Sequence, residues 1–157
     1  MMNMPYIDDS KGALLPVTPQ GSSIIKIPPQ VSGIGPYFIQ SQYVSVNSVS
    51  GQKMKCQGEL IDIIDISDGM AVLRDPLALS YGYAPFGDAL IFKVLNPIYD
   101  LQLIGKEILG DQVYPYIYGL TIDSCAFKEW KTVAAAIRSC RNYEVINSTF
   151  ERLESAD

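Results

Sequence analysis

Apolar and polar residues alternate at every second position along much of the chain between residues 37 and 122, which is the spacing of half-buried β-strands. The predicted strands cover residues 37–49, 53–56, 60–66, 70–73, 89–95, 99–104 and 113–122. Ser67, Asp68 and Gly69 stand between the third and fourth of these and predict a tight hairpin turn. Short strands joined by turns predict a mainly β fold with antiparallel neighbours.

One segment has a different period. Between Cys125 and Arg141, apolar residues recur at spacings of three and four, which is typical of one face of a helix. They are Phe127, Trp130, Val133, Ala134, Ile137 and Cys140. Asp123 or Ser124 suits the N-cap position, and the arginines of the last turn suit the helix dipole. The pattern predicts one amphipathic helix over about 125–141, and leaves 143–154 open between a strand and a short helix.

The first 36 residues differ in composition from the rest. They contain six prolines and four glycines, which exclude a helix and disfavour a central strand. We therefore expect an extended arm over 1–36, with one short strand at 23–27, followed by a single β-rich domain over 37–157. The predicted fold class is mainly β (α+β), an antiparallel barrel or sandwich with the helix packed on it.

Composition narrows the chemistry. The chain has no histidine, so it cannot supply a Ser-His-Asp or Cys-His site or a histidine-ligated metal centre. Its net charge of −5 and scattered basic residues argue against nucleic-acid binding. Three cysteines without metal-site spacing indicate thiols in a reducing compartment. No signal peptide or membrane span is evident, and we expect no cofactor and no metal.

An acidic series, Glu59, Asp62, Asp65 and Asp68, has a spacing of three that would align carboxylates on a helix. The residues between them are mostly isoleucine, which favours a strand, where Asp62 and Asp65 face opposite sides. The series also lacks the spacing of a calcium-binding loop. We interpret it as solvated acids on a strand and its turn.

Aromatic and apolar clusters are the candidate interfaces. On the predicted strand 113–122, alternation would place three tyrosine rings along one face, and the loop at 81–87 carries further aromatic residues. Charged residues make up 18% of the chain while tyrosines number ten, a balance that suits large protein contacts. The candidate subunit-interface residues are Tyr114, Tyr116, Tyr118, Tyr81, Tyr83, Phe86, Ile24, Ile25 and Ile27.

No motif identifies a family. A Pro/Gly-rich arm, low charge with many tyrosines and no catalytic constellation together predict a non-enzymatic structural subunit that assembles with copies of itself into a ring, tube or shell. A component of a tailed-phage particle (tail, neck, baseplate or head completion) has this character, which places the chain in a virion or the cytoplasm with other subunits of that assembly as partners. Two alternatives stay open: a β-barrel or sandwich that binds carbohydrate or a small ligand, and a hydrolase using carboxylates among Glu59, Asp62 and Asp65.

Overall fold

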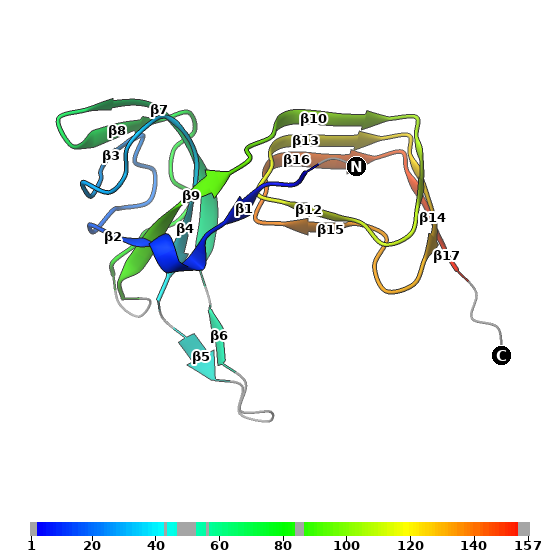
Figure 1. Ribbon diagram of the computed structural model, residues 1–157, viewed down its shortest axis with the longest axis horizontal. Coiled ribbons are helices and arrows are strands. Elements are labelled where there is room, and N and C mark those ends of the chain that lie inside the picture. Colours follow the sequence, from blue (N-terminus) through cyan, green and yellow to red (C-terminus); the bar gives the residue numbers. More distant parts are fainter. Residues whose placement is uncertain (1–2, 43, 47–52, 56, 84–86, 154–157) are drawn as a thin grey trace. The chain divides into compact units, whose positions relative to one another are not determined.

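The computed structural model describes residues 3–42, 44–46, 53–55, 57–83 and 87–153 (Figure 1). The chain divides into two compact units. The sheet unit comprises residues 7–95, and the solenoid unit comprises residues 1–6 together with 96–157. This division differs from the expected arm over 1–36 and single domain over 37–157, because strands within the first 36 residues pair with strands of the sheet unit.

The sheet unit is built on one seven-stranded sheet, in the order β1-β9-β4-β7-β8-β3, with β2 also pairing with β9. The strands of the sheet are β1 (Tyr6–Ile7), β2 (Ala13–Leu15), β3 (Ile24–Lys26), β4 (Gly35–Ser41), β7 (Gly58–Ser67), β8 (Met70–Leu73) and β9 (Ala89–Leu95), and the boundary between the two units falls within β1. A short 3-10 helix, η1 (Asp9–Lys11), precedes β2, and β5 (Val44–Val46) pairs with β6 (Lys53–Lys55) in a separate hairpin. The sheet is antiparallel, as expected, and it does not close into a barrel.

Alternation places one side of these strands in a common core. Ile39, Ile61, Ile63 and Ile91 are buried together there. The predicted hairpin between β7 and β8 is confirmed: Asp68 and Gly69 both have positive φ, 52° and 73°, as a two-residue turn between twisted strands requires. The short strand expected at 23–27 is also confirmed, since β3 pairs with β8.

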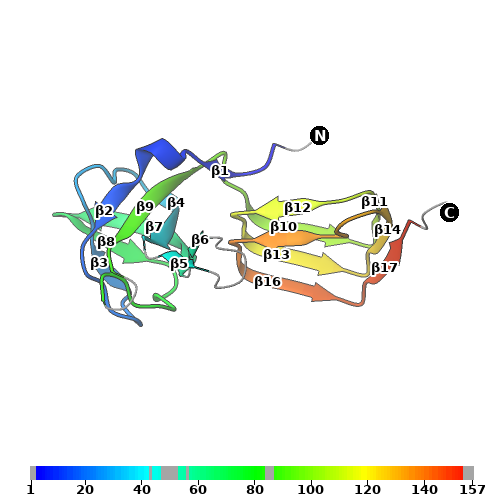
Figure 2. The same cartoon turned by 90° about the horizontal axis from the view of Figure 1, so that it is seen from below.

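The solenoid unit coils the chain into successive rungs that stack in parallel (Figure 2). Its strands are β10 (Tyr99–Ile104), β11 (Glu107–Leu109), β12 (Val113–Pro115), β13 (Tyr118–Asp123), β14 (Ala126–Trp130), β15 (Ala136–Arg138), β16 (Arg141–Ile146) and β17 (Thr149–Arg152). Three parallel ladders result: β10-β13-β16, β11-β14-β17 and β12-β15. We call residues 99–115, 118–138 and 141–152 the first, second and third rungs. Tyr99 pairs with Tyr118 and Tyr118 with Arg141, so one turn takes 19 and then 23 residues.

Residues with positive φ stand at equivalent places in successive rungs. Most lie at corners just after a strand ends, whereas Asp100, Gly119 and Asn142 lie one residue inside β10, β13 and β16, and Glu129 lies inside β14. The equivalent sets are Asp100, Gly119 and Asn142; Gly105, Ser124 and Asn147; Gly110 and Glu129; and Tyr116 and Ser139. The residue types at these positive-φ positions differ from rung to rung, which helps to explain why no repeat is visible in the sequence.

A carboxylate fixes the loop that makes the second rung longer. Asp111 Oδ1 accepts hydrogen bonds from the backbone N–H of Lys131 at 2.7 Å and of Thr132 at 3.2 Å. Both donors belong to the segment between β14 and β15, one rung beyond Asp111. The hydrogen bond from Lys131 is the main cause that lowers the pKa of Asp111, because it stabilises the charged form.

The expected helix over 125–141 is wrong, because that segment forms β14, a loop and β15. An irregularity at Glu129 inside β14 and a corner at Ser139 after β15 turn apolar residues inward at spacings of three and four, which imitates a helical period. The barrel-or-sandwich expectation also fails for residues 96–152, since parallel rungs replace antiparallel strands. The open alternative over 143–154 resolves to strands β16 and β17 in the described residues.

Candidate assembly surface at the open end of the solenoid

The interior of the solenoid consists of columns of apolar side chains, one from each rung. Leu101, Leu120 and Tyr143 form one column, and Leu103, Ile122 and Val145 form the next. A third column contains Ile108, Phe127 and Phe150. In it the rings of Phe127 and Phe150 stack with centroids 5.2 Å apart and planes inclined by 10°. The parallel register therefore stacks apolar side chains of successive rungs on one another.

Burial changes abruptly along these columns. In the second rung Leu120, Ile122 and Phe127 are 0% exposed, because a rung covers them on each side. In the third rung their equivalents are open to solvent: Tyr143 is 57%, Val145 38% and Phe150 49% exposed. We call these three residues the open row. It is the interior of the solenoid, left uncovered by any described residue.

Part of the opposite end of the solenoid is covered by the chain itself. Residues 3–6 group with the solenoid unit, and Figure 2 draws this segment above part of the first rung, whose Leu101, Leu103 and Ile108 stay half-buried. Met4 packs against the apolar core of the solenoid, and Asn96 Nδ2 donates a hydrogen bond to the carbonyl of Asn3 at 2.6 Å. Repeat folds need such a cover at each end, because a terminal repeat exposes the face that its neighbour would bury. The two ends therefore differ in the described structure.

The backbone at the open end, like the side chains of the open row, can bind a partner. β16 is the last strand of one ladder and β17 the last of another, and no described strand pairs with their outer edges. Unpaired edge strands present rows of N–H and C=O groups to which another strand can add. An apolar row flanked by two open edges can thus bind a further extended segment by hydrogen bonds and burial together.

Charged groups frame the open row. The guanidinium of Arg152 lies 5.8 Å from the centre of the Trp130 ring, and its Nε donates to the carbonyl of Lys131 at 3.1 Å. Arg141 and Glu144 lie on β16, and Glu151 on β17. Both signs of charge therefore border the surface, so a partner with the same composition is not repelled.

The predicted tyrosine row does not exist as one row. β12 ends at Pro115, Tyr116 is a corner with φ of 52°, and β13 begins at Tyr118. Pro115 lacks a backbone donor and the corner turns the chain, so the three tyrosines lie on different elements. Tyr114 and Tyr118 are buried in the solenoid, where burial raises the pKa of Tyr114. A role for any of the three in a subunit contact stays a prediction.

The other candidate interface residues are scattered. Tyr81 is buried in the sheet unit, and its hydroxyl donates to Glu59 Oε1 at 3.0 Å, whereas Tyr83 is partly exposed. Phe86 lies outside the described residues. Of the isoleucines expected in the arm, Ile24 is exposed while its neighbours Ile25 and Ile27 belong to the sheet core. Their part in any subunit contact is untested by this geometry.

Two members of the acidic series make structural contacts, and the interpretation of the series as solvated acids is wrong for Asp62, which is buried. Glu59 accepts from the backbone N–H of Ala78 and Leu79 at 3.0 Å each, which fixes the loop after β8. Asp62 is buried and receives Arg74 Nε at 2.8 Å. Among the described residues, no group of histidine, cysteine or carboxylate side chains is arranged to hold a metal ion.

The cysteines that the structure describes line the solenoid. Cys125 Sγ donates to the carbonyl of Leu103 at 3.2 Å, and Cys140 Sγ donates to the carbonyl of Tyr114 at 3.0 Å. Burial raises the pKa of the Cys140 thiol, so it stays protonated and unreactive at neutral pH. Both thiols therefore act as core residues that satisfy backbone groups at corners.

The open row itself was missed by the sequence reasoning. Tyr143 and Val145 alternate on one strand, and Phe150 follows Phe127 by 23 residues, but these signals are weak without knowledge of the rungs.

No helix in the described part of the chain is long and apolar enough to cross a membrane.

No family model matches the chain, and no curated protein matches it. Solved structures are similar. The tailspike protein gp49 from Pseudomonas phage LKA1 superimposes with a TM-score of 0.52 at 17% identity, over 82% of this chain and 23% of that one. The tailspike gp61 of Pseudomonas phage phi297 gives a TM-score of 0.54 at 10% identity, over 92% of this chain and 31% of that one. The chain therefore spans less than a third of either tailspike, and what it shares with them is a fold found in phage tail proteins.

Proposed function

We propose that this chain is a structural component of a tailed-phage particle that associates with copies of itself through the open row. The observation that carries the proposal is the exposure of Tyr143, Val145 and Phe150, whose equivalents one rung earlier are fully buried. The fold shared with two phage tailspikes supports the phage-tail assignment. A virion location, a ring, tube or shell as the product, and other subunits as further partners belong to the same proposal.

A second copy fits the open row for three reasons. It brings the same apolar row, so that each copy covers the other in an isologous contact. It brings the free edges of β16 and β17, which can pair with each other. It also brings both Arg141 and Glu144 on β16, so an antiparallel contact sets opposite charges against each other.

The contacts of Glu59 and Asp62 favour a structural role over a hydrolase that uses carboxylates. Glu59 accepts hydrogen bonds from two backbone N–H groups and a tyrosine hydroxyl, and Asp62 is ion-paired with Arg74. Acid–base catalysis needs a carboxylate that reaches a substrate, whereas these two hold the loop at 74–81 to β7. These contacts favour a structural role for Glu59 and Asp62, and a non-enzymatic protein is part of the same proposal.

The experiment is the mass of the purified chain in solution, measured by light scattering over a range of concentrations. The wild type is expected to form a defined oligomer as concentration rises. Val145→Asp, which sets a charge in the middle of the open row, is expected to leave it monomeric. The matched control is Leu109→Asp, because Leu109 is a similarly exposed aliphatic residue on the solenoid but lies on β11 of the first rung. A monomeric wild type at every concentration, or an oligomer that survives Val145→Asp, would contradict the proposal.

A further inference from the structure

The sheet unit contains a cavity of about 240 Å³ that plays no part in the proposed function. It lies over one face of β4 and β9, where Tyr37 is paired with Lys93, and it is bordered by η1 and by the loop before β4. Tyr37, Ile91 and Val31 form a buried apolar floor. Asp8, Lys11 and Lys93 stand at its rim with Gln30 and Ser32.

The floor is rigid. The Tyr37 hydroxyl donates to the carbonyls of Ser32 at 2.8 Å and Gly33 at 3.0 Å, which ties the loop to the sheet. Burial raises the pKa of Tyr37, so the hydroxyl stays a neutral donor. Because the buried ring is anchored through its hydroxyl and its backbone belongs to β4, the cavity is present without a ligand, as is usual for small-molecule sites.

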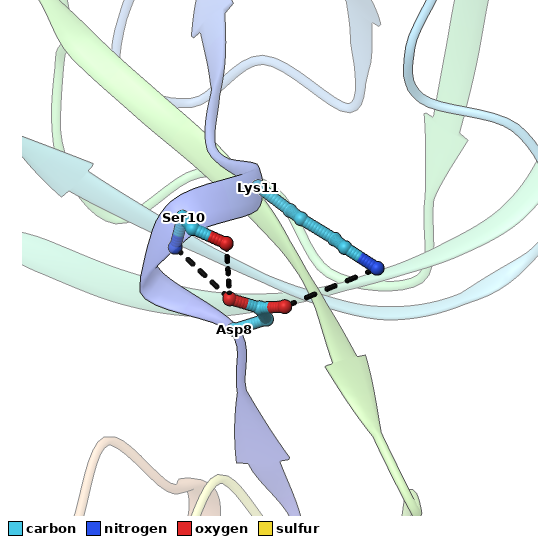
Figure 3. A network of polar contacts seen from close by, with 3 residues as sticks. All are labelled: Asp8, Ser10 and Lys11. Carbon is cyan, nitrogen blue, oxygen red and sulfur yellow. Dashed lines mark hydrogen bonds and ion pairs between the residues drawn. The ribbon is translucent and has the colours of Figure 1, made fainter.

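The charges at the rim are unbalanced toward the positive. Asp8 is occupied locally: its Oδ1 accepts from the backbone N–H of Ser10 at 3.0 Å and from the Ser10 hydroxyl at 2.6 Å (Figure 3). These bonds lower the pKa of Asp8 and keep it charged. Its Oδ2 lies 3.9 Å from the Lys11 ammonium, which is a loose contact on a side chain that is 80% exposed.

The ammonium group of Lys93 has no polar partner among the described residues. Its side chain is exposed, and its Nζ lies 4.0 Å from the point where a β-carbon on Gly33 would stand. Within the described residues it forms no ion pair and no hydrogen bond. An ammonium beside an apolar cavity, in a chain whose net charge is −5, is a specific place for an anionic group.

We propose that this cavity binds a small organic monoanion, a carboxylate on a body of about one ring. The carboxylate would pair with Lys93, with Lys11 as the second cation, and the ring would lie on Tyr37 and Ile91. The volume sits just below the range usual for larger ligands, which limits the body to a single ring. One unpaired ammonium favours a single negative charge over a polyanion.

The test uses benzoate and its neutral counterpart benzamide, which have nearly the same size and shape. Backbone amide signals of residues 31–33 are followed by NMR while each compound is titrated into the full chain. Benzoate is expected to give saturable shifts with a Kd in the millimolar range, as suits a ligand of about nine non-hydrogen atoms. Benzamide is expected to give none that saturate.

Two variants make the result specific. Lys93→Gln removes the charge and keeps an unbranched polar side chain that is one bond shorter, and is expected to raise the Kd for benzoate about fivefold. Lys26→Gln is the control, since Lys26 is an exposed lysine of the same sheet that does not line the cavity. Absence of saturable shifts, equal binding of benzamide, or an unchanged Kd in Lys93→Gln would each overturn the proposal. Binding of benzoate to this cavity does not require self-association, so the titration and the mass measurement test the two proposals independently.

Discussion

Phe127 and Phe150 are paired in the same column of the solenoid, and replacing each by alanine separates a covered rung from an open one. The two rings stack on each other, so each replacement removes the same aromatic contact. They differ in what lies beyond: Phe127 is enclosed on both sides, and Phe150 is half exposed. The pair is therefore a direct probe of whether the third rung is uncovered in the single chain.

The magnitudes follow from burial. Truncating a fully buried phenylalanine costs about 3–5 kcal/mol, since transfer energy is lost and a cavity remains. For Phe150 about half of a transfer term of about 2–3 kcal/mol is at stake, and no closed cavity forms. The stacking contact of about 0.5–1.5 kcal/mol is lost in both. Phe127→Ala is therefore expected to cost about 2 kcal/mol more than Phe150→Ala.

Urea unfolding followed by tryptophan fluorescence measures this difference. Trp130 is the single tryptophan of the chain and lies on β14, so its emission reports on the solenoid unit. At protein concentrations low enough to keep the chain monomeric, the midpoints of the two variants should differ by about 1 M urea, given a slope of about 2 kcal/mol/M. Equal midpoints, with Phe150→Ala costing as much as Phe127→Ala, would refute the reasoning, because Phe150 would then be covered within one chain.

Two other predictions concern the corners and loops of the solenoid. Gly119→Ala is expected to destabilise the chain by about 1–3 kcal/mol, because φ is +85° and the added carbon would stand 2.5 Å from Asp100 Oδ1, whereas Gly105→Ala meets open space and should cost less in the same unfolding assay. Asp111→Asn is expected to flatten the dependence of stability on pH. The folded pKa of Asp111 is lowered, so its carboxylate stabilises the wild type above the unfolded pKa of about 4, and this contribution is lost as pH falls through the folded pKa. Urea midpoints between neutral pH and pH 3 check it, and an equal acid loss in both proteins would count against that assignment.

The sheet unit was largely predictable because its signals are local. Strands β7 and β8 with the Asp68-Gly69 turn follow from alternation and turn chemistry over sixteen residues of sequence. The pairing of the first 36 residues was not, because β2 joins β9 and β3 joins β8 across long stretches of chain. The prolines and glycines of this segment are typical of an extended arm, but they lie between short strands that pair with the sheet.

The solenoid could not be predicted because its positive-φ positions differ in residue type from rung to rung. Gly119 and Asn142 occupy equivalent places inside β13 and β16, and Gly105 and Ser124 occupy equivalent corners after β10 and β13. The candidate site depended on that coil. Tyr143 and Phe150 are recognised as candidate interface residues only because the earlier members of their columns are buried. The pattern of a single strand does not show whether another rung covers it.

The cover at the first rung also sets an order of events during synthesis. Asn3 and Asn96 are 93 positions apart, so residues 3–6 leave the ribosome long before the rung they protect. At about 5–20 residues per second, several seconds separate the two. Residues 3–6 are therefore already synthesised when the first rung emerges, and each later rung emerges after the rung on which it stacks.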